Sequence, residues 1–549
     1  MSSTFGSFNT VRLGIYAAQK GLDVTGNNIT NINTNGYTRQ RLDQVSLSVS
    51  AADQYASQYK THIGQGVVVN GVSQLRDPGL DIAYRQAQTN VGASDAWLAG
   101  LEDLAKILDE VGKGDGEQDD GVILNQLNDL RDLISQAVTN GLDTSEGAIR
   151  ASAKSLVGLF NQYASELTQL QEKTATDLNQ DVDRVNSLLS NIQELNIAIR
   201  DADIRGDAAL ELRDNRNLML DSLSQYIGID VTYSMEDAGA GLMVEKLSVS
   251  FTGEDGKTKY NLIDGEYAAQ LSVLNGQDPD DPTVTYNYDL SLSPLTDMDG
   301  VQKDPNAKDV TLLDNDTHGS LQALRELLTE EGEYASQDDI NEDPKASSKR
   351  GIPYYQNALD SLAREFATQM NALNKDNDDP AQHLEGSGVL FTNGTVNDGT
   401  DGITAANISI SNAWTQGDVH MIASRDPNAP SGDRSNLGEF LNLFNSDFEF
   451  DPKDVVADAV GSPYQGSFED MLLHTESTLA EDQMSATSVL NNYAVTLDSI
   501  YTDRDSISGV DLNDETTSLM MYQKAYTAAC RLMTVLEEAL DSLINGTVV

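Results

Sequence analysis

The two ends of this chain share one apolar spacing, and that spacing constrains the fold more than any other feature. On the N-terminal stripe, apolar or small residues recur at alternating steps of three and four: Phe8, Val11, Ile15, Ala18, Leu22, Thr25, Ile29 and Ile32. On the C-terminal stripe the same rule holds for Leu519, Tyr522, Tyr526, Ala529, Met533, Leu536, Leu540 and Leu543. This is the seam spacing of a coiled coil. A helix with one narrow apolar stripe cannot bury that stripe alone, so the ends are expected to pair with each other or with other subunits.

The N-terminal stripe runs into a block rich in asparagine. Five of the nine residues from 27 to 35 are Asn, whose side chains compete for backbone hydrogen bonds and so end helices. Asn35 and Gly36 form a turn dipeptide, because Gly adopts positive φ without steric cost. The sequence therefore predicts that the first helix ends in a tight turn here.

The block from Asp23 to Arg41 resembles the N-terminal signature of the flagellar axial proteins, which are the rod, hook and hook-associated proteins. That signature reads NNIANxNTPGYSRQ, and Asn35 stands where the family usually has Pro, although both residues suit a turn. Residues 508–545 are similar to the C-terminal signature of the hook-associated branch. Three internal stretches agree with that branch: 212–224, 319–324 and 359–367. The resemblance is therefore spread over the whole chain.

The resemblance implies a structural component of the bacterial flagellum that joins hook to filament through coiled-coil packing of terminal helices. The implied partners are identical subunits in a ring, the hook protein, a second hook–filament junction protein and an export chaperone. The implied location is extracellular, reached through the flagellum's own type III apparatus without a cleaved signal peptide. No enzymatic activity, cofactor or metal is implied.

The resemblance also places the assembly determinants on the Asn-rich block and on both stripes. They are Phe8, Val11, Ile15, Leu22, Asn28, Ile29, Asn31, Asn33, Gly36, Tyr37, Leu519, Tyr522, Gln523, Ala525, Tyr526, Met533, Leu536, Leu540 and Leu543. A seam of this kind is more often internal core than a subunit interface. Position favours the interface here, because chain ends are usually the least ordered parts of a domain unless something holds them.

Two rival functions stay open. The first is another axial protein, such as a hook, rod or flagellin-like subunit, against which the stretches at 319–324 and 359–367 speak. The second is a secreted enzyme carried on an axial-type tail, with its activity in a β-rich insert. No phosphate-binding loop, nucleophile elbow or paired catalytic base appears in the sequence to support it.

Charge narrows the choice of partners. The 549 residues include 87 acidic and 35 basic ones, a formal net charge of -52, which argues against binding to nucleic acid or to an anionic membrane. Residues 1–50 nevertheless carry a net charge of +2 and residues 508–549 a net charge of -4. This difference modestly favours pairing of the N-terminal helix with the C-terminal helix.

The expected fold class is mainly α with β-rich inserts. It would be an elongated multi-domain rod, with a helical core built from both chain ends and two outer β-rich domains. Residues 42–90 are expected to form a linker with a short strand at 66–70 and a turn at 77–79, and helices are expected from residue 91. The expected segments are 1–45 (terminal assembly helix and signature), 46–230 (linker and first part of the helical core), 231–315 (β-rich domain), 316–378 (second part of the core), 379–434 (second β-like insert), 435–507 (third part of the core) and 508–549 (C-terminal assembly helix).

Metal and thiol sites are not expected from the residue spacing. The five His residues are too far apart in sequence to form a zinc cluster, and the Asp-rich loops at 115–120, 314–319 and 376–379 depart from the EF-hand pattern. Cys530 is the only cysteine and lies beside the C-terminal stripe, which predicts a buried structural thiol. Residues 1–25 have neither the apolar core nor the cleavage site of a signal peptide.

Overall fold

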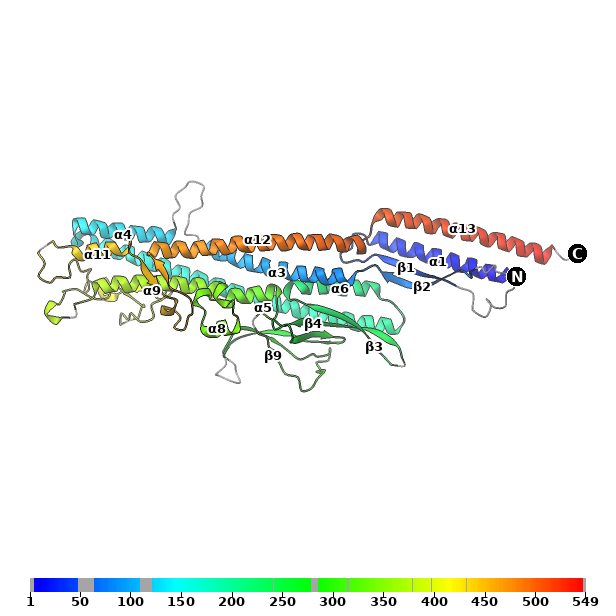
Figure 1. Cartoon of the computed structure of the whole chain (residues 1–549), viewed down its shortest axis with the longest axis horizontal. Helices are drawn as coiled ribbons and strands as arrows, with labels where there is room; N and C mark the ends of the chain where they lie inside the picture. Colours follow the sequence, from blue (N-terminus) through cyan, green and yellow to red (C-terminus); the bar gives the residue numbers. More distant parts are fainter. Residues whose placement is uncertain are drawn as a thin grey trace.

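A computed structural model shows an elongated rod with both chain termini at the same end (Figure 1). It describes residues 4–47, 64–108, 121–239, 241–277, 285–313, 315–377, 379–395, 397–430 and 432–546. Helices run along the rod and small antiparallel sheets lie on its side. The predicted fold class, mainly α with β-rich inserts, is confirmed.

Helices supply most of the length of the rod. The α-helices are α1 (Thr4–Thr30), α3 (Pro78–Ile107), α4 (Val122–Asn140), α5 (Leu142–Ile204), α6 (Leu210–Tyr226), α7 (Gly319–Thr329), α8 (Gln337–Glu342), α9 (Ile352–Asn374), α10 (Asn412–Gln416), α11 (Ser435–Leu443), α12 (Phe468–Ser508) and α13 (Leu512–Asn545). The short 3-10 helices are η1 (Gly332–Tyr334), η2 (Ala346–Ser348), η3 (Pro380–Gln382) and η4 (Pro452–Asp454). The longest helix, α5, has 63 residues, which at 1.5 Å per residue corresponds to about 95 Å.

The N-terminal part of α3 corrects the expected linker. The Asp77 side chain accepts a hydrogen bond from the backbone N–H of Gly79 and caps α3, and Pro78 occupies the first turn, where its missing N–H costs nothing. Residues 78–90 are therefore helical. The sequence analysis expects a turn at 77–79, whereas here these residues start a helix. The strand expected at 66–70 is present as part of β2 (Val67–Gln74), paired with β1 (Gln40–Ser46).

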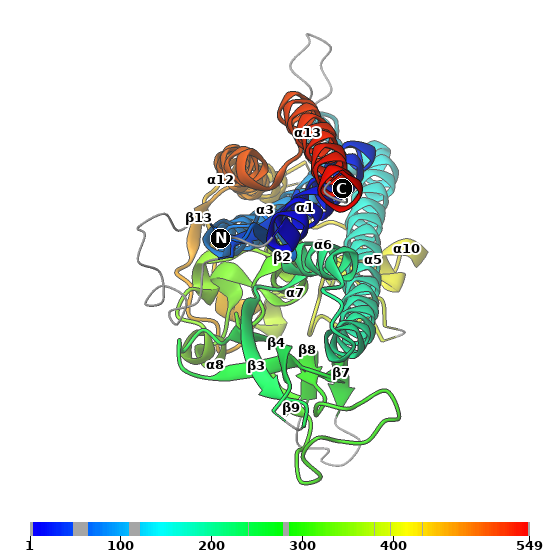
Figure 2. The ribbon, with the colours of Figure 1, turned by 90° about the vertical axis from the view of Figure 1, so that its right-hand side faces the viewer.

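The largest β-rich unit lies beside the C-terminal half of α5 and beside α6 (Figures 1 and 2). One antiparallel sheet has the order β3-β4-β5-β6 and a second has the order β7-β8-β9. Their strands are β3 (Asp230–Asp237), β4 (Met243–Thr252), β5 (Lys259–Asp264), β6 (Tyr267–Ala268), β7 (Leu271–Gln277), β8 (Thr285–Leu292) and β9 (Val310–Thr311). Alternate residues of β4, among them Leu247, Val249 and Phe251, join the core against α5, as the period-2 pattern of strands requires.

The segment expected as a second β-like insert is less regular than its composition predicts. Between residues 379 and 434 it contains the short strands β10 (Phe391–Thr392) and β11 (Ser409–Ile410), which pair with each other, and the helix α10. The side-chain oxygens of Asn393 and Asp398 accept hydrogen bonds from backbone N–H groups, and these bonds take the place of the backbone pairing of longer strands. A further short pair, β12 (Phe448–Phe450) and β13 (Tyr464–Gly466), precedes α12.

The apolar core occupies the rod and does not reach its terminal end. One buried cluster joins α3, α4, α5, α9, α11 and the start of α12 around Phe366, Trp414 and Phe468. A second cluster joins α5, α6 and α7 to the β-rich unit. In the described part of the chain, no member of these clusters precedes Trp97 or follows Ala486. These clusters therefore include no residue of α1 or α13.

Candidate functional site

The two stripe helices, α1 and α13, pack against each other at one end of the rod (Figure 1). They run antiparallel, since both termini lie at the outer end and both helices reach back to the rod. Of the two alternatives left open by the sequence, pairing within the chain is the one present here. On its other side α1 contacts β1 and β2, so it is covered on two faces whereas α13 is covered on one.

Gly21 sets how closely the two helices approach. Gly21 is buried on α1, and a Cβ at this position would lie 2.5 Å from Cδ1 and Cε1 of the Tyr522 ring on α13. Only a residue without a side chain allows this contact. Tyr522 therefore packs directly on the backbone of α1.

The residues predicted for assembly differ in how far this pairing covers them. On α1, Val11 is buried, Phe8, Ile15, Leu22 and Ile29 are half-buried, and Ile32 is exposed. On α13, the half-buried residues of this set are Leu519, Tyr522, Met533, Leu536 and Leu540, and Tyr522 lies against Gly21 of α1. Gln523, Ala525, Tyr526 and Leu543 are exposed, as are Asn33 and Gly36. Cys530 is half-buried rather than buried.

α13 carries a second apolar stripe that the sequence analysis missed. The same three-and-four spacing, displaced by one residue, connects Met521, Ala525, Ala528, Leu532, Val535 and Ala539, and we call these six residues the outer stripe. One residue corresponds to 100° of rotation, so the outer stripe lies next to the face that packs on α1. Met521 is 58 % exposed, Leu532 51 % and Val535 57 %. α13 is thus apolar on two adjacent faces, and α1 covers one of them.

The Asn-rich signature folds back on itself just after α1. The Asn28 side chain is buried and exchanges two hydrogen bonds with the Gln40 backbone: its Nδ2 donates to the Gln40 carbonyl at 2.9 Å, and its Oδ1 accepts from the Gln40 N–H at 3.0 Å. The Tyr37 hydroxyl also donates to Asn28 Oδ1, at 2.9 Å. Burial and the carboxylates of Asp214, Glu211 and Glu515 raise the pKa of Tyr37, so its hydroxyl stays protonated as a donor. Asn31 Nδ2 donates to the Asn27 carbonyl.

This signature turn is also attached to α6 and α13. Gly36 has φ of +77° and lies against Leu218 of α6, and the backbone N–H of Thr38 donates to Asp214 Oδ2 at 3.1 Å. Arg39 Nε pairs with the buried carboxylate of Glu515 on α13 at 2.7 Å. The predicted charge difference between the chain ends rests on basic residues near the N-terminus. Of these, Arg39 pairs with α13, whereas Lys20 pairs with Asp23 and Arg41 pairs with Asp43, both close by in sequence. Asn28 and Tyr37 therefore contact the same chain, and their role in assembly stays a prediction.

Gly21→Val is expected to separate the terminal helices. The new side chain overlaps the Tyr522 ring, and overpacking of this kind costs about 1–3 kcal/mol. Amide hydrogen exchange in α1 and α13 should rise about tenfold or more, while exchange in α5 stays unchanged. Gly14→Val is the matched control, because it adds the same β-branched residue to the same helix where nothing lies within 4 Å. Equal exchange in both variants would contradict the packing described here.

Other kinds of site find little support among the described residues. No group of three or more His, Cys, Asp or Glu side chains there could hold a metal ion. Of the Asp-rich loops, residues 115–120 lie outside the described residues, as do Asp314 and Asp378. In the same described ranges, no helix is both long enough and apolar enough to cross a membrane.

Comparison with known proteins shows what this chain is similar to. Residues 116–387 match the family model "Flagellar hook-associated protein FlgK helical domain", and residues 504–546 match "Flagellar basal body rod FlgEFG protein C-terminal". The chain is 26% identical over 552 residues to "Flagellar hook-associated protein 1" of Bacillus subtilis, covering 100% of this chain and 99% of that protein. It is 26% identical over 284 residues to the protein of the same name in Escherichia coli, covering 51% of this chain and 47% of that protein.

A solved structure shares the fold. The flagellar hook junction protein FlgK from Burkholderia pseudomallei superposes with a TM-score of 0.52 at 14% sequence identity, covering 78% of this chain and 100% of that chain. At this identity the likeness concerns the fold alone.

Proposed function

We propose that the chain is a member of the family of flagellar hook-associated proteins, a structural subunit that joins hook to filament through its terminal helices. The single observation that carries the mechanism is the outer stripe of α13, whose Met521, Leu532 and Val535 are more than half exposed. Burial of such side chains yields about 25 cal/mol per Å² of apolar surface. A neighbouring helix seated on the outer stripe would complete the packing that α1 provides on the adjacent face.

The proposed partners are those that the resemblance to flagellar hook-associated proteins implies. The terminal pair would contact identical subunits in a ring, the hook protein on one side and a second hook–filament junction protein on the other, and an export chaperone would hold the chain before assembly. The proposed location is extracellular, at the hook–filament junction, after export without a cleaved signal peptide. The stripe residues named from the sequence would act in two groups. The half-buried ones pair α13 with α1, and the exposed ones contact neighbours.

The two rival functions have less support. Residues 116–387 match a hook-associated family model, which favours this branch over a hook, rod or flagellin-like subunit. The curated relatives are structural flagellar proteins, which favours a structural role over an enzyme carried on an axial tail.

Attachment to isolated hooks tests the proposal. Purified full-length chain is expected to bind the distal end of isolated hooks, and a chain ending at residue 511 is expected to remain unbound, since it lacks α13. Negative-stain electron microscopy and co-sedimentation measure both. Equal attachment of the two chains would contradict a role for α13, and failure of both would contradict the junction function.

A further inference from the structure

Six asparagines of the chain are followed directly by glycine: Asn35, Asn70, Asn140, Asn275, Asn393 and Asn545. In such a pair the backbone nitrogen of the glycine can attack the side-chain carbonyl carbon of the asparagine, because glycine has no side chain to hinder the approach. A nitrogen–carbon bond forms, the bond to the side-chain nitrogen breaks, and ammonia leaves with the proton of the backbone N–H. Water then opens the resulting succinimide ring to aspartate or isoaspartate.

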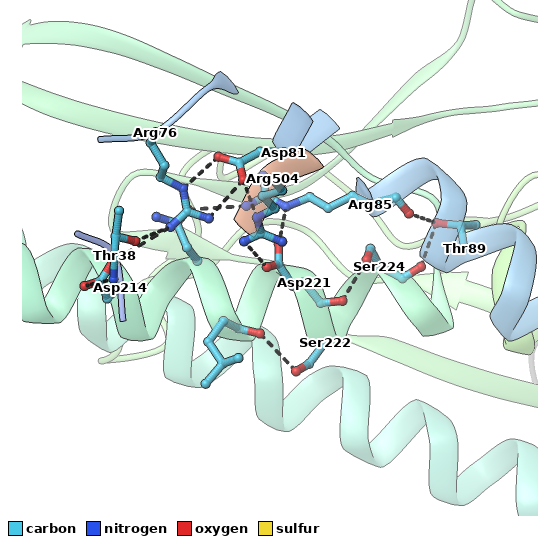
Figure 3. Close-up of polar contacts among 12 residues, drawn as sticks. Thr38, Arg76, Asp81, Arg85, Thr89, Asp214, Asp221, Ser222, Ser224 and Arg504 are labelled. Atoms are coloured by element: carbon cyan, nitrogen blue, oxygen red, sulfur yellow. Dashed lines mark hydrogen bonds and ion pairs between the residues drawn. The ribbon is translucent and has the colours of Figure 1, made fainter. Parts of the chain in front are cut away.

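This reaction needs a side chain and a backbone that can move, and polar side chains of the rod are often held by several partners. Figure 3 shows an example where α3, α6 and α12 meet. Arg504 lies 3.0 Å from Asp81 Oδ1 through Nε and 2.6 Å from Asp221 Oδ2 through Nη2, and Arg85 Nε lies 2.8 Å from Asp221 Oδ1. A side chain held in this way reacts slowly, because its bonds must break before it can turn.

Asn393 is held in the same manner, in the loop between β10 and β11. Its Oδ1 accepts hydrogen bonds from the Thr395 N–H at 3.2 Å and from the Thr395 hydroxyl at 2.7 Å. Its Nδ2 donates to the Asp401 carbonyl at 2.8 Å. These bonds must break before the carbonyl carbon of Asn393 can turn toward the Gly394 nitrogen, so the structure protects this pair.

Asn140 is protected through its backbone instead. It is the last residue of α4, and the Gly141 N–H that follows it donates to the Ala137 carbonyl at 2.9 Å. Arg434 covers this end of the helix, and its Nη1 donates to the Val138 carbonyl at 2.9 Å. The nitrogen that would attack is therefore engaged, although the Asn140 side chain is exposed.

Asn275 differs from both, because it lies at an irregular point of an edge strand. Its strand, β7, is at one edge of its sheet, and both Asn275 and Gly276 are exposed. The pairing with β8 skips Asn275, since Leu274 is opposite Asp289 and Gly276 is opposite Tyr286. Gly276 has φ of +88°, and a bulge leaves its extra residue out of the ladder. The Asn275 side chain has no hydrogen-bond partner among the described residues.

We propose that Asn275 is a site of spontaneous deamidation in the folded chain, and that it converts to aspartate and isoaspartate well before Asn140 and Asn393. The remaining three pairs belong to the two chain ends, outside the rod. This inference goes beyond the proposed function, because the reaction needs neither a hook nor a partner. Enzymatic repair of isoaspartate uses S-adenosylmethionine from the cytoplasm, so at the proposed extracellular location the product would accumulate with the age of the subunit. That consequence, unlike the reaction itself, rests on the proposed function.

Peptide mass spectrometry of the purified full-length chain tests the proposal. The folded protein is kept in mildly alkaline buffer, digested with pepsin at acid pH to prevent further deamidation, and assayed for aspartate and isoaspartate at the three positions. Conversion at Asn275 should be at least about tenfold faster than at Asn140 or Asn393, since less local structure has to open there. A parallel sample unfolded in urea is the control. Its three rates should converge, because the contacts that distinguish the sites are lost.

Asn275→Gln identifies the product. Its peptide should show no deamidation on the same timescale, because attack on a glutamine side chain would close a larger ring that forms more slowly. Equal rates at Asn275 and Asn393 in the folded chain overturn the proposal. A difference that persists in urea also overturns it, since the neighbouring sequence would then set the rates. Hook attachment takes no part in this experiment, so either result leaves the proposed function standing.

Discussion

Leu532→Asp is expected to leave the folded chain intact and to abolish its attachment to hooks. Leu532 is 51 % exposed on the outer stripe, so in the isolated chain the aspartate remains in water and the free energy of unfolding should change by no more than about 0.5 kcal/mol. In an assembled seam the same carboxylate would be buried without a partner. That costs several kcal/mol, and about 3 kcal/mol already corresponds to a loss in affinity of about 100-fold.

Thermal unfolding followed by circular dichroism, and co-sedimentation with isolated hooks, measure the two halves of this prediction. Thr534→Asp is the matched control, because Thr534 is exposed on the polar side of α13, away from both apolar faces. It introduces the same charge into the same helix and should still attach. Attachment of Leu532→Asp at the level of Thr534→Asp would remove the outer stripe from the assembly surface. Leu536→Asp is a less clean probe, since Leu536 is half-buried on the face that packs on α1.

Phe468→Ala is expected to produce the largest loss of stability. Phe468 is 2 % exposed at the start of α12, and its ring centre lies 5.5 Å from that of Phe366 and 4.8 Å from that of Phe448. Truncation of a buried phenylalanine removes apolar contacts and leaves a cavity, at a cost of about 3–5 kcal/mol. The midpoint of urea unfolding should fall accordingly.

Phe468→Leu provides the scale for this measurement, because it keeps most of the apolar volume and should lose clearly less stability than Phe468→Ala. Hydrogen exchange in α1 and α13 should be unaffected by either change, since the apolar cluster around Phe468 does not extend to the terminal helices. Equal losses for the two substitutions, or a loss below about 1 kcal/mol for the alanine variant, would contradict a close-packed site.

Helices and strands could be predicted from the sequence wherever a local residue pattern determines them. The three-and-four spacing from Phe8 and from Leu519 predicted two amphipathic helices, and α1 and α13 cover both stretches. The Asn-rich block predicted the end of the first helix, and α1 ends at Thr30. The prediction from local sequence was wrong at Pro78. Proline suits both a β-turn and the first turn of a helix, and here the helix forms because the Asp77 side chain caps it.

The sequence alone determined that both chain ends form helices with one narrow apolar face, and that each helix needs a partner to bury that face. The reason is that the spacing of apolar residues depends only on positions close together in the chain. Only the tertiary structure decided that α1 covers one face of α13 and leaves Leu532 and Val535 exposed. It also decided that Asn28 bonds to the Gln40 backbone and that Arg504 meets Asp81 and Asp221. Those contacts join residues far apart along the chain or across a turn, and their partners are set by how the helices pack, which no local spacing encodes.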